Sequence, residues 1–244
     1  MKAMVLAAGL GTRLRPLTDD RPKALVKLNG RTLLEIALAR LRSFGVREVI
    51  VNVHHFAGMV EEYLAANGNF GMRIEISREQ ELLDTGGGLK KAAWFFDDDA
   101  PFILHNVDVL STIDLGRMAQ IRTEQGALAT LAVQQRESSR ALLFDAEGRL
   151  CGRRPGRGME PQWARAAADA KELAFAGIHV ISPKIFDKMT EQGAFSIIDA
   201  YLRLAGAGEK IAAFRVDGCA WRDAGRPESL KAAGQEIAAG RFSV

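Results

Sequence analysis

The stretch AMVLAAGLGTRLRPLTDDRPK (residues 3–23) decides the fold of this chain. It opens with an apolar run, Ala3–Ala8, which has the composition of a buried parallel strand. The run ends abruptly in the glycine-rich turn Gly9–Thr12, where backbone N–H groups can approach phosphate oxygens without an intervening side chain. Arg13 and Lys23 add positive charge beside this turn. The stretch therefore predicts a strand followed by a loop that binds a polyphosphate.

Two better-known phosphate-binding loops do not fit this stretch. A dinucleotide fingerprint needs Gly or Ala three residues after the second glycine, and Leu14 stands there. The P-loop pattern G-x-x-x-x-G-K-[ST] is absent. A dinucleotide-dependent oxidoreductase is therefore disfavoured.

The stretch instead resembles the loop L-A-A-G-x-G-[ST]-R-[LM]-x-P-L-T-x(4)-P-K of the sugar-1-phosphate nucleotidyltransferases. The resemblance implies a catalytic role for Arg13 and Lys23. It also implies a set of nucleotide-binding residues at the strand end and in the loop: Leu6, Ala7, Ala8, Gly9, Gly11, Thr12 and Arg13.

The chain after this loop alternates between strand and helix patterns. Apolar runs predict strands at Glu48–Val53, Arg73–Ser77 and Phe102–His105. A capping box, Thr32–Glu35, predicts a helix through Phe44, and Phe56–Ala66 has the pattern of a second helix. We expect an α/β fold, with a Rossmann-like, mostly parallel mixed sheet flanked by helices. The resemblance implies the nucleotide-diphospho-sugar transferase type of this fold.

The second half of the chain continues with mixed elements. Asp114 is expected to cap a helix, and residues 152–170, with four arginines and no clear period, are expected to form a mobile loop. The other predicted elements are strands at Ala127–Val133, Leu173–Ser182 and Ile211–Val216, a hairpin at Leu142–Leu150, and helices at Ser196–Leu204 and Pro227–Ile237. We expect one domain, 1–244, with a nucleotide-binding half at about 1–110 and a sugar-binding half at about 111–244.

Three later motifs extend the resemblance over the whole chain. The segment EQELLDTGGG (residues 79–88) resembles the family's second nucleotide loop, which implies nucleotide contacts at Gly86 and Gly87 before a helix at Leu89–Phe96. The N-x-D motif implies that Asn106 binds substrate and Asp108 binds Mg²⁺, beside a bulkier Val107 than is usual. The motif W-x-D-x-G-x-P-E (residues 221–228) makes Asp223 the second implied Mg²⁺ ligand.

Other polar positions carry weaker signals. Asn52 and His54 follow a predicted strand at the edge where α/β sheets bind ligands, although an ordinary solvated histidine is the favoured interpretation of His54. Gly177 matches a family glycine that lets a sugar approach the backbone. Lys171 and Glu172 reverse the family's Glu-Lys pair, so its phosphate-holding role is not transferred to them.

Composition limits the classes of partner. The net charge is +3, and no basic stripe with interleaved aromatic residues predicts nucleic-acid binding. Two cysteines without metal spacing and the lack of a 20-residue apolar run predict a cytoplasmic protein with no membrane association. The oligomeric state is not readable from the sequence.

The implied reaction joins an NTP to a sugar 1-phosphate and releases pyrophosphate. The favoured substrates are UTP and N-acetylmuramic acid 1-phosphate. GTP with mannose or heptose 1-phosphate, or CTP with phosphocholine, remains an alternative. A non-catalytic nucleotide-sugar sensor is the non-enzyme alternative, which the presence of Lys23 and both aspartates disfavours.

Overall fold

In the computed structural model, which describes residues 1–242, strand β1 (Lys2–Leu6) is an interior strand of a ten-stranded sheet. It pairs in parallel with β4 (Glu48–Val53) on one side and β6 (Phe102–Asn106) on the other, and β5 (Arg73–Arg78) extends the parallel part beyond β4. The carboxyl ends of these strands share one edge of the sheet, which is where ligands bind in open α/β folds. The predicted mixed, mostly parallel sheet flanked by helices is confirmed.

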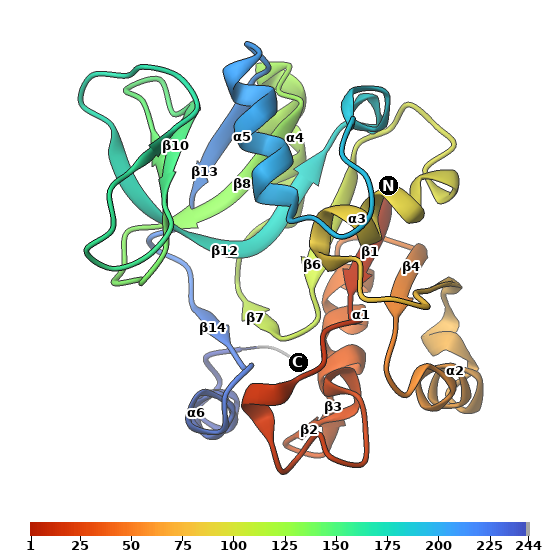
Figure 1. The fold of residues 1–244 in the computed structure, drawn as a ribbon. Coiled ribbons are helices and arrows are strands. Elements are labelled where there is room, and N and C mark those ends of the chain that lie inside the picture. Colours follow the sequence, from red (N-terminus) through yellow and green to blue (C-terminus); the bar gives the residue numbers. More distant parts are fainter. Residues whose placement is uncertain (243–244) are drawn as a thin grey trace.

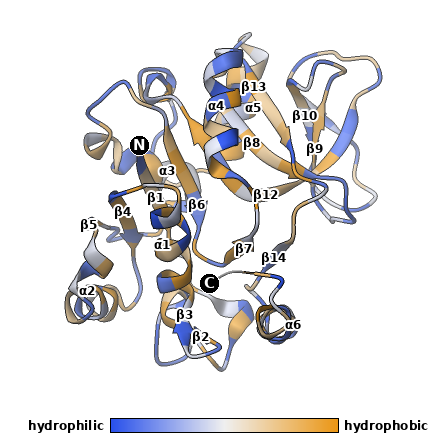
Figure 2. Ribbon diagram, turned by 180° about the vertical axis from the view of Figure 1, so that it is seen from behind, coloured by the Kyte–Doolittle hydropathy of each residue, from blue (hydrophilic) through white to orange (hydrophobic). Residues whose placement is uncertain are grey.

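Alternating side chains of β1 point into two different cores. Ala3 and Val5 pack with helices α1 (Leu33–Ser43), α2 (Ala57–Ala66) and α6 (Pro227–Ala238) on one face. Met4 packs with α3 (Asp84–Lys91) and α5 (Ile197–Gly206) on the other. Because both faces are covered, the residues from Ala3 to Leu6 are all apolar. Figure 2 colours the ribbon by hydropathy and shows hydrophobic residues in the central strands.

The long strand β12 (Lys171–Ile181) connects the parallel sheet to the second half of the chain (Figure 1). Its C-terminal part pairs antiparallel with β6, and its N-terminal part pairs with β9 (Ala141–Phe144). Gly177, with φ of +75°, lies at an irregularity in its pairing with β8. The remaining strands of this sheet are β8 (Ala129–Gln134), β10 (Leu150–Arg154), β11 (Gln162–Trp163) and β13 (Ile211–Arg215).

The remaining strands form two small antiparallel sheets. One pairs β2 (Lys27–Leu28) with β3 (Arg31–Thr32). The other pairs β7 (Val109–Ser111) with β14 (Trp221–Asp223) and therefore joins the segment after β6 to the C-terminal motif. Short 3-10 helices occur at Thr12–Leu14, Lys23–Leu25, Gly68–Gly71, Ala93–Phe95 and Pro183–Lys188.

Several helix ends follow the sequence predictions. The Thr32 hydroxyl accepts the Glu35 N–H at 3.1 Å, although the Glu35 carboxylate binds Arg31 and does not complete the capping box. Asp114 accepts the Arg117 N–H at 2.8 Å and caps α4 (Leu115–Gln125). The predicted start of α4 is therefore confirmed by its cap.

Two local predictions are wrong. Residues 152–170 are not an irregular loop throughout, because β10 and β11 pair within this segment, and Arg153 and Arg165 form ion pairs with Asp199 and Asp145. The helix expected at Leu89–Phe96 begins instead at Asp84 and ends at Lys91. Residues 152–170 are ordered by strand-pairing hydrogen bonds and by ion pairs with distant residues. Such contacts leave no local pattern in the sequence.

No helix within residues 1–242 combines the length and apolar character needed to cross a membrane.

Candidate active site

Two aspartates from distant parts of the chain meet where β7 and β14 pair. Asp108 immediately precedes β7, and Asp223, the last residue of β14, lies opposite Val109 in this ladder. The Asp108 carbonyl also accepts the Ala224 N–H at 2.8 Å. The structure therefore brings the two predicted metal ligands together at one edge of the fold.

The charges of this pair are arranged around Lys23. Its ammonium forms an ion pair with Asp108, whose side chain also hydrogen-bonds that of Asp223. Burial opposes ionisation of Asp108, but the charge and hydrogen bond of Lys23 together with the Asp223 contact lower the pKa of Asp108. Burial and the negative charge of Asp108 raise the pKa of Asp223. The positive charge of Lys23 thus offsets part of the repulsion between the two adjacent carboxylates.

Gly225 fits into this charged group because it has no side chain. Its N–H donates to the Asp223 carboxylate at 2.7 Å. A Cβ atom at this position would lie 2.7 Å from an oxygen of each aspartate and 3.1 Å from Lys23 Nζ. The glycine of the C-terminal motif is therefore required for the two carboxylates to come together, a role that the sequence prediction did not assign.

The glycine-rich turn wraps next to Lys23. Gly11 has a φ of +66°, and a Cβ there would lie 2.9 Å from Thr18 Cγ2 and 3.1 Å from Lys23 Cβ. The Thr18 hydroxyl donates to the Gly11 carbonyl at 2.9 Å and so fixes the turn. Because the loop is folded this closely, its backbone and Lys23 lie on the same surface.

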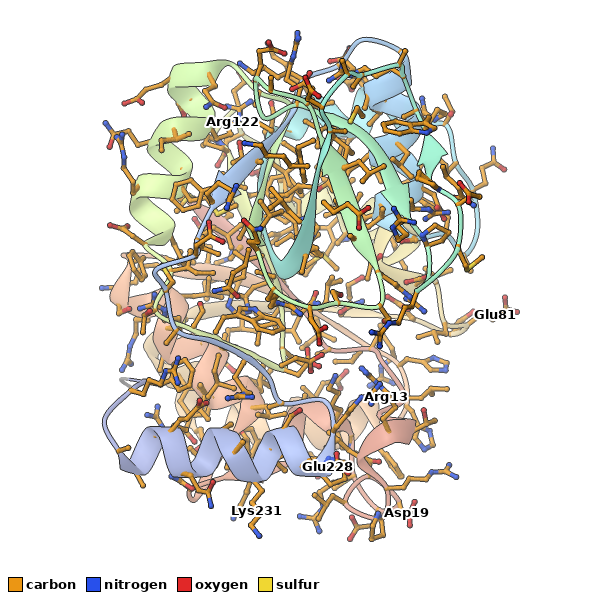
Figure 3. All side chains as sticks on the ribbon, turned by 90° about the vertical axis from the view of Figure 1, so that its left-hand side faces the viewer. Arg13, Asp19, Glu81, Arg122, Glu228 and Lys231 are labelled. Atoms are coloured by element: carbon orange, nitrogen blue, oxygen red, sulfur yellow. The ribbon has the colours of Figure 1, made fainter. Side chains whose placement is uncertain are left out.

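The exposed loop residues lie together on one side of the molecule. Gly9, Thr12 and Arg13 are solvent-exposed, and Figure 3 shows Arg13 on the side that also carries Asp19 and the start of α6 at Glu228. An exposed guanidinium beside the turn is free to contact a bound anion.

A cavity of about 450 Å³ opens between the glycine-rich turn and the start of α3. Its wall combines backbone of the turn, Lys23, the acidic residues Glu79 and Asp84, and uncharged polar side chains. The lining residues are Leu6, Ala8, Gly9, Lys23, Asn52, Glu79, Leu82, Asp84, Thr85, Asn106 and Ala194. Ala7 is buried behind this wall at the end of β1.

A buried polar network fixes one wall of the cavity. The Asn52 carboxamide accepts the Ala7 N–H and donates to a Glu79 oxygen, both at 2.7 Å. The other Glu79 oxygen accepts the Leu83 N–H at 3.0 Å. His54 lies at the side of this network, with its Nδ1 3.0 Å from the Glu79 carbonyl. The sequence analysis placed Asn52 at the sheet edge but did not identify Glu79. The signal that could have identified Glu79 is its position as an acidic residue directly after a strand.

The triple glycine has a packing role within α3. The N–H groups of Gly86 and Gly87 point at the Phe195 carbonyl, at 2.9 and 3.3 Å. A Cβ at Gly86 would overlap the Phe195 ring, and one at Gly87 would overlap the Gly193 carbonyl. Gly86 and Gly87 are absent from the cavity lining, where Asp84 and Thr85 lie instead. The glycines thus allow α3 to approach the segment before α5.

Asn106 and Gly177 lie close together near the sheet edge. A Cβ at Gly177 would lie 2.9 Å from Asn106 Nδ2 and 2.8 Å from Val109 Cγ2. Packing between β12 and the N-x-D segment therefore requires glycine at this position.

The chain matches a family model described as "Nucleotidyl transferase" over residues 2–142. The chain belongs to the nucleotidyl transferase family. It is 34% identical to an N-acetylmuramate alpha-1-phosphate uridylyltransferase of Caulobacter vibrioides, over 97% of this chain and 96% of that protein. The predicted family and its enzyme class, sugar-1-phosphate nucleotidyltransferase, are confirmed.

One further relative is a nucleotidyltransferase by name, and one solved structure shares the fold. The chain is 30% identical to a UTP–glucose-1-phosphate uridylyltransferase of Synechocystis sp., over 93% of this chain but only 60% of that longer protein. The structure of an inositol-1-phosphate CTP transferase from T. maritima superposes with a TM-score of 0.77 at 18% identity, over 98% of this nucleotidyltransferase and 95% of that chain. The fold of the nucleotide-diphospho-sugar transferases is therefore confirmed as well.

Proposed function

We propose that this nucleotidyltransferase transfers UMP from UTP to N-acetylmuramic acid 1-phosphate and releases pyrophosphate. The observation that carries the proposed nucleotidyl transfer is the contact of Lys23, Asp108 and Asp223 beside the cavity of the glycine-rich turn. The choice of substrates is supported by the similarity to the C. vibrioides uridylyltransferase over nearly the full length of both chains.

We assign the nucleotide and the sugar to different parts of the site according to the residues that line it. All cavity-lining residues except Ala194 come from residues 1–110, which supports a nucleotide-binding half and a sugar-binding half at 111–244. We assign the nucleotide to this cavity, with the base toward the Asn52–Glu79 network and the phosphates along the turn and Arg13. Gly86 and Gly87 then support the nucleotide site through the position of α3. Asn106 and Gly177 are assigned to the sugar side.

The carboxylate pair has the donor chemistry of a magnesium site. Asp108 and Asp223 offer hard oxygen ligands, and the hydrogen bond between them is the contact that a bound cation would replace. No cluster of three or more potential metal ligands occurs among residues 1–242, so substrate phosphates would complete the coordination. Bound Mg²⁺ would neutralise phosphate charge at this point.

The side chains of this protein align the two substrates and supply positive charge. The sugar phosphate oxygen is already anionic, so the reaction needs no protein nucleophile or general base. This oxygen attacks the α-phosphorus of the NTP. The bond between the α-phosphorus and the oxygen that bridges to the β-phosphate breaks, and pyrophosphate leaves. Lys23 is placed to stabilise the charge that develops on the α-phosphate, and Arg13 to hold the departing pyrophosphate. Since the reaction consumes an NTP, we place the enzyme in the cytoplasm.

A matrix of four NTPs against sugar 1-phosphates, read by pyrophosphate release, tests the proposal. We expect the largest kcat/KM for UTP with N-acetylmuramic acid 1-phosphate. A larger value for GTP with mannose 1-phosphate would replace the proposed substrates while keeping the reaction. Binding of nucleotide sugars without pyrophosphate release from any pair would instead support the sensor alternative.

A further inference from the structure

A second cavity, of about 430 Å³, is lined by two arginines. It is formed by the segment after β8, the segment after β10 and the start of β12. Its lining residues are Arg136, Glu137, Ser138, Ser139, Ala141, Arg157, Glu172 and Ala174. The proposed transfer reaction does not use this group of residues.

Arg136 connects this cavity to the aspartate pair. Its guanidinium carbon lies 4.0 Å from the centre of a Trp221 ring, and one of its N–H groups donates to the Phe175 carbonyl at 3.0 Å. The Trp221 indole N–H donates to the Ala176 carbonyl at 2.7 Å. Trp221 lies two residues before Asp223 on β14, so Arg136 connects this cavity to the short strand that carries Asp223.

The two arginines that line the cavity form no close ion pair with a carboxylate among residues 1–242. Among residues 1–242, no carboxylate lies within 4.0 Å of the Arg136 or Arg157 guanidinium, and the buried Nε of Arg136 has no hydrogen-bond partner. Glu172 is already paired with Arg154, whose Nε lies 3.0 and 3.1 Å from its two oxygens. Glu137 is the remaining lining carboxylate and is solvent-exposed. Two guanidiniums that lack a close carboxylate partner among residues 1–242 are well suited to an anionic ligand.

We propose that the Arg136–Arg157 cavity binds a carboxylate on the sugar ring, so the preferred substrates are acidic sugar 1-phosphates. This inference rests on the proposed function, because the 1-phosphate must point toward Lys23 and the aspartates to attack the nucleotide. A second anionic group on the ring then extends past Trp221 to the two arginines. Ser138 and Ser139 supply hydroxyl donors on the same wall.

N-acetylmuramic acid 1-phosphate and N-acetylglucosamine 1-phosphate provide a matched pair of probes, since they differ only by the lactyl ether and its carboxylate. With UTP, we expect the intact enzyme to prefer the acidic sugar by more than about tenfold in kcat/KM. In Arg157→Gln this preference should fall by about 10- to 100-fold, and Arg157→Lys should keep part of it. Arg157 is exposed and makes no hydrogen bond through its side chain among residues 1–242, so the variant should fold.

Arg117→Gln is the matched control, because Arg117 is an exposed arginine on α4 that faces Glu124. It should leave the preference intact. An unchanged preference in Arg157→Gln would overturn the proposal, and equal losses with both sugars would mean that the arginine binds the 1-phosphate instead.

A binding measurement distinguishes failure of this inference from failure of the proposed function. If no sugar 1-phosphate releases pyrophosphate, calorimetry with free N-acetylmuramic acid and N-acetylglucosamine still tests the cavity. Tighter binding of the acid, lost in Arg157→Gln, supports the carboxylate site, and equal binding of the two sugars overturns it.

Discussion

Replacing Gly225 by alanine tests whether the aspartate pair must keep its position. The new Cβ would lie 2.7 Å from an oxygen of Asp108 and of Asp223, and 3.1 Å from Lys23 Nζ. Since carbon and oxygen atoms in contact are normally more than about 3.2 Å apart, each carboxylate must move by roughly 0.5 Å. Displacements approaching 1 Å in an aligned site cost about 100-fold in rate, so we expect kcat to fall by about 10- to 100-fold.

The fold should survive this substitution. The backbone of Gly225 does not have a positive φ, so alanine brings no backbone strain and reduces the entropy of the unfolded chain. Local overpacking should cost about 1–3 kcal/mol, which lowers Tm by no more than about 10 °C.

Pyrophosphate release and thermal unfolding, measured on the same preparations, separate the two effects. Gly218→Ala is the matched control, because Gly218 lies seven residues earlier and a Cβ there meets nothing within 4 Å. Turnover of Gly225→Ala within about threefold of the unmodified enzyme, at an unchanged Tm, would refute the argument that the carboxylate positions limit the reaction.

Three further predictions concern the same site and the buried histidines. Lys23→Ala should reduce kcat about 100-fold or more with an intact fold, and a loss of only a few-fold would remove Lys23 from the mechanism. Asp108→Asn and Asp223→Asn should each nearly abolish pyrophosphate release, and the double variant should be little worse, whereas additive losses would show that the two act separately. Burial lowers the pKa of His105 to about 4 and that of His179 to about 3, from an ordinary 6.5. Because only the unfolded chain then binds these protons, stability should be complete above pH 6.5 and fall toward pH 4, by about 3 kcal/mol for each histidine. Urea unfolding from pH 7 to 4 measures how steeply the free energy of unfolding falls with pH. This fall should be smaller in His179→Gln, and an equal fall would contradict the contribution of His179.

The sequence by itself determined the parts of this protein that rest on local chemistry. The apolar run before Gly9 specifies a strand buried on both faces, and the glycine-rich turn follows because Gly11 needs a positive φ. Thr32 and Asp114 begin their helices because a side-chain oxygen accepts an N–H only three residues ahead. These features depend on neighbours within a few residues, so they can be read directly from the chain.

Only the tertiary structure decided how distant segments meet. The pairing of β7 with β14 brings Asp223 to Asp108, and it reveals Gly225 as the residue that leaves room for both. The Asn52–Glu79 contact and the packing of α3 against Phe195 likewise join segments far apart in sequence. Such contacts form because burying polar groups requires partners, whichever part of the chain supplies them. A linear pattern records which residue types are present, but the free energy of these contacts depends on distances that exist only after folding.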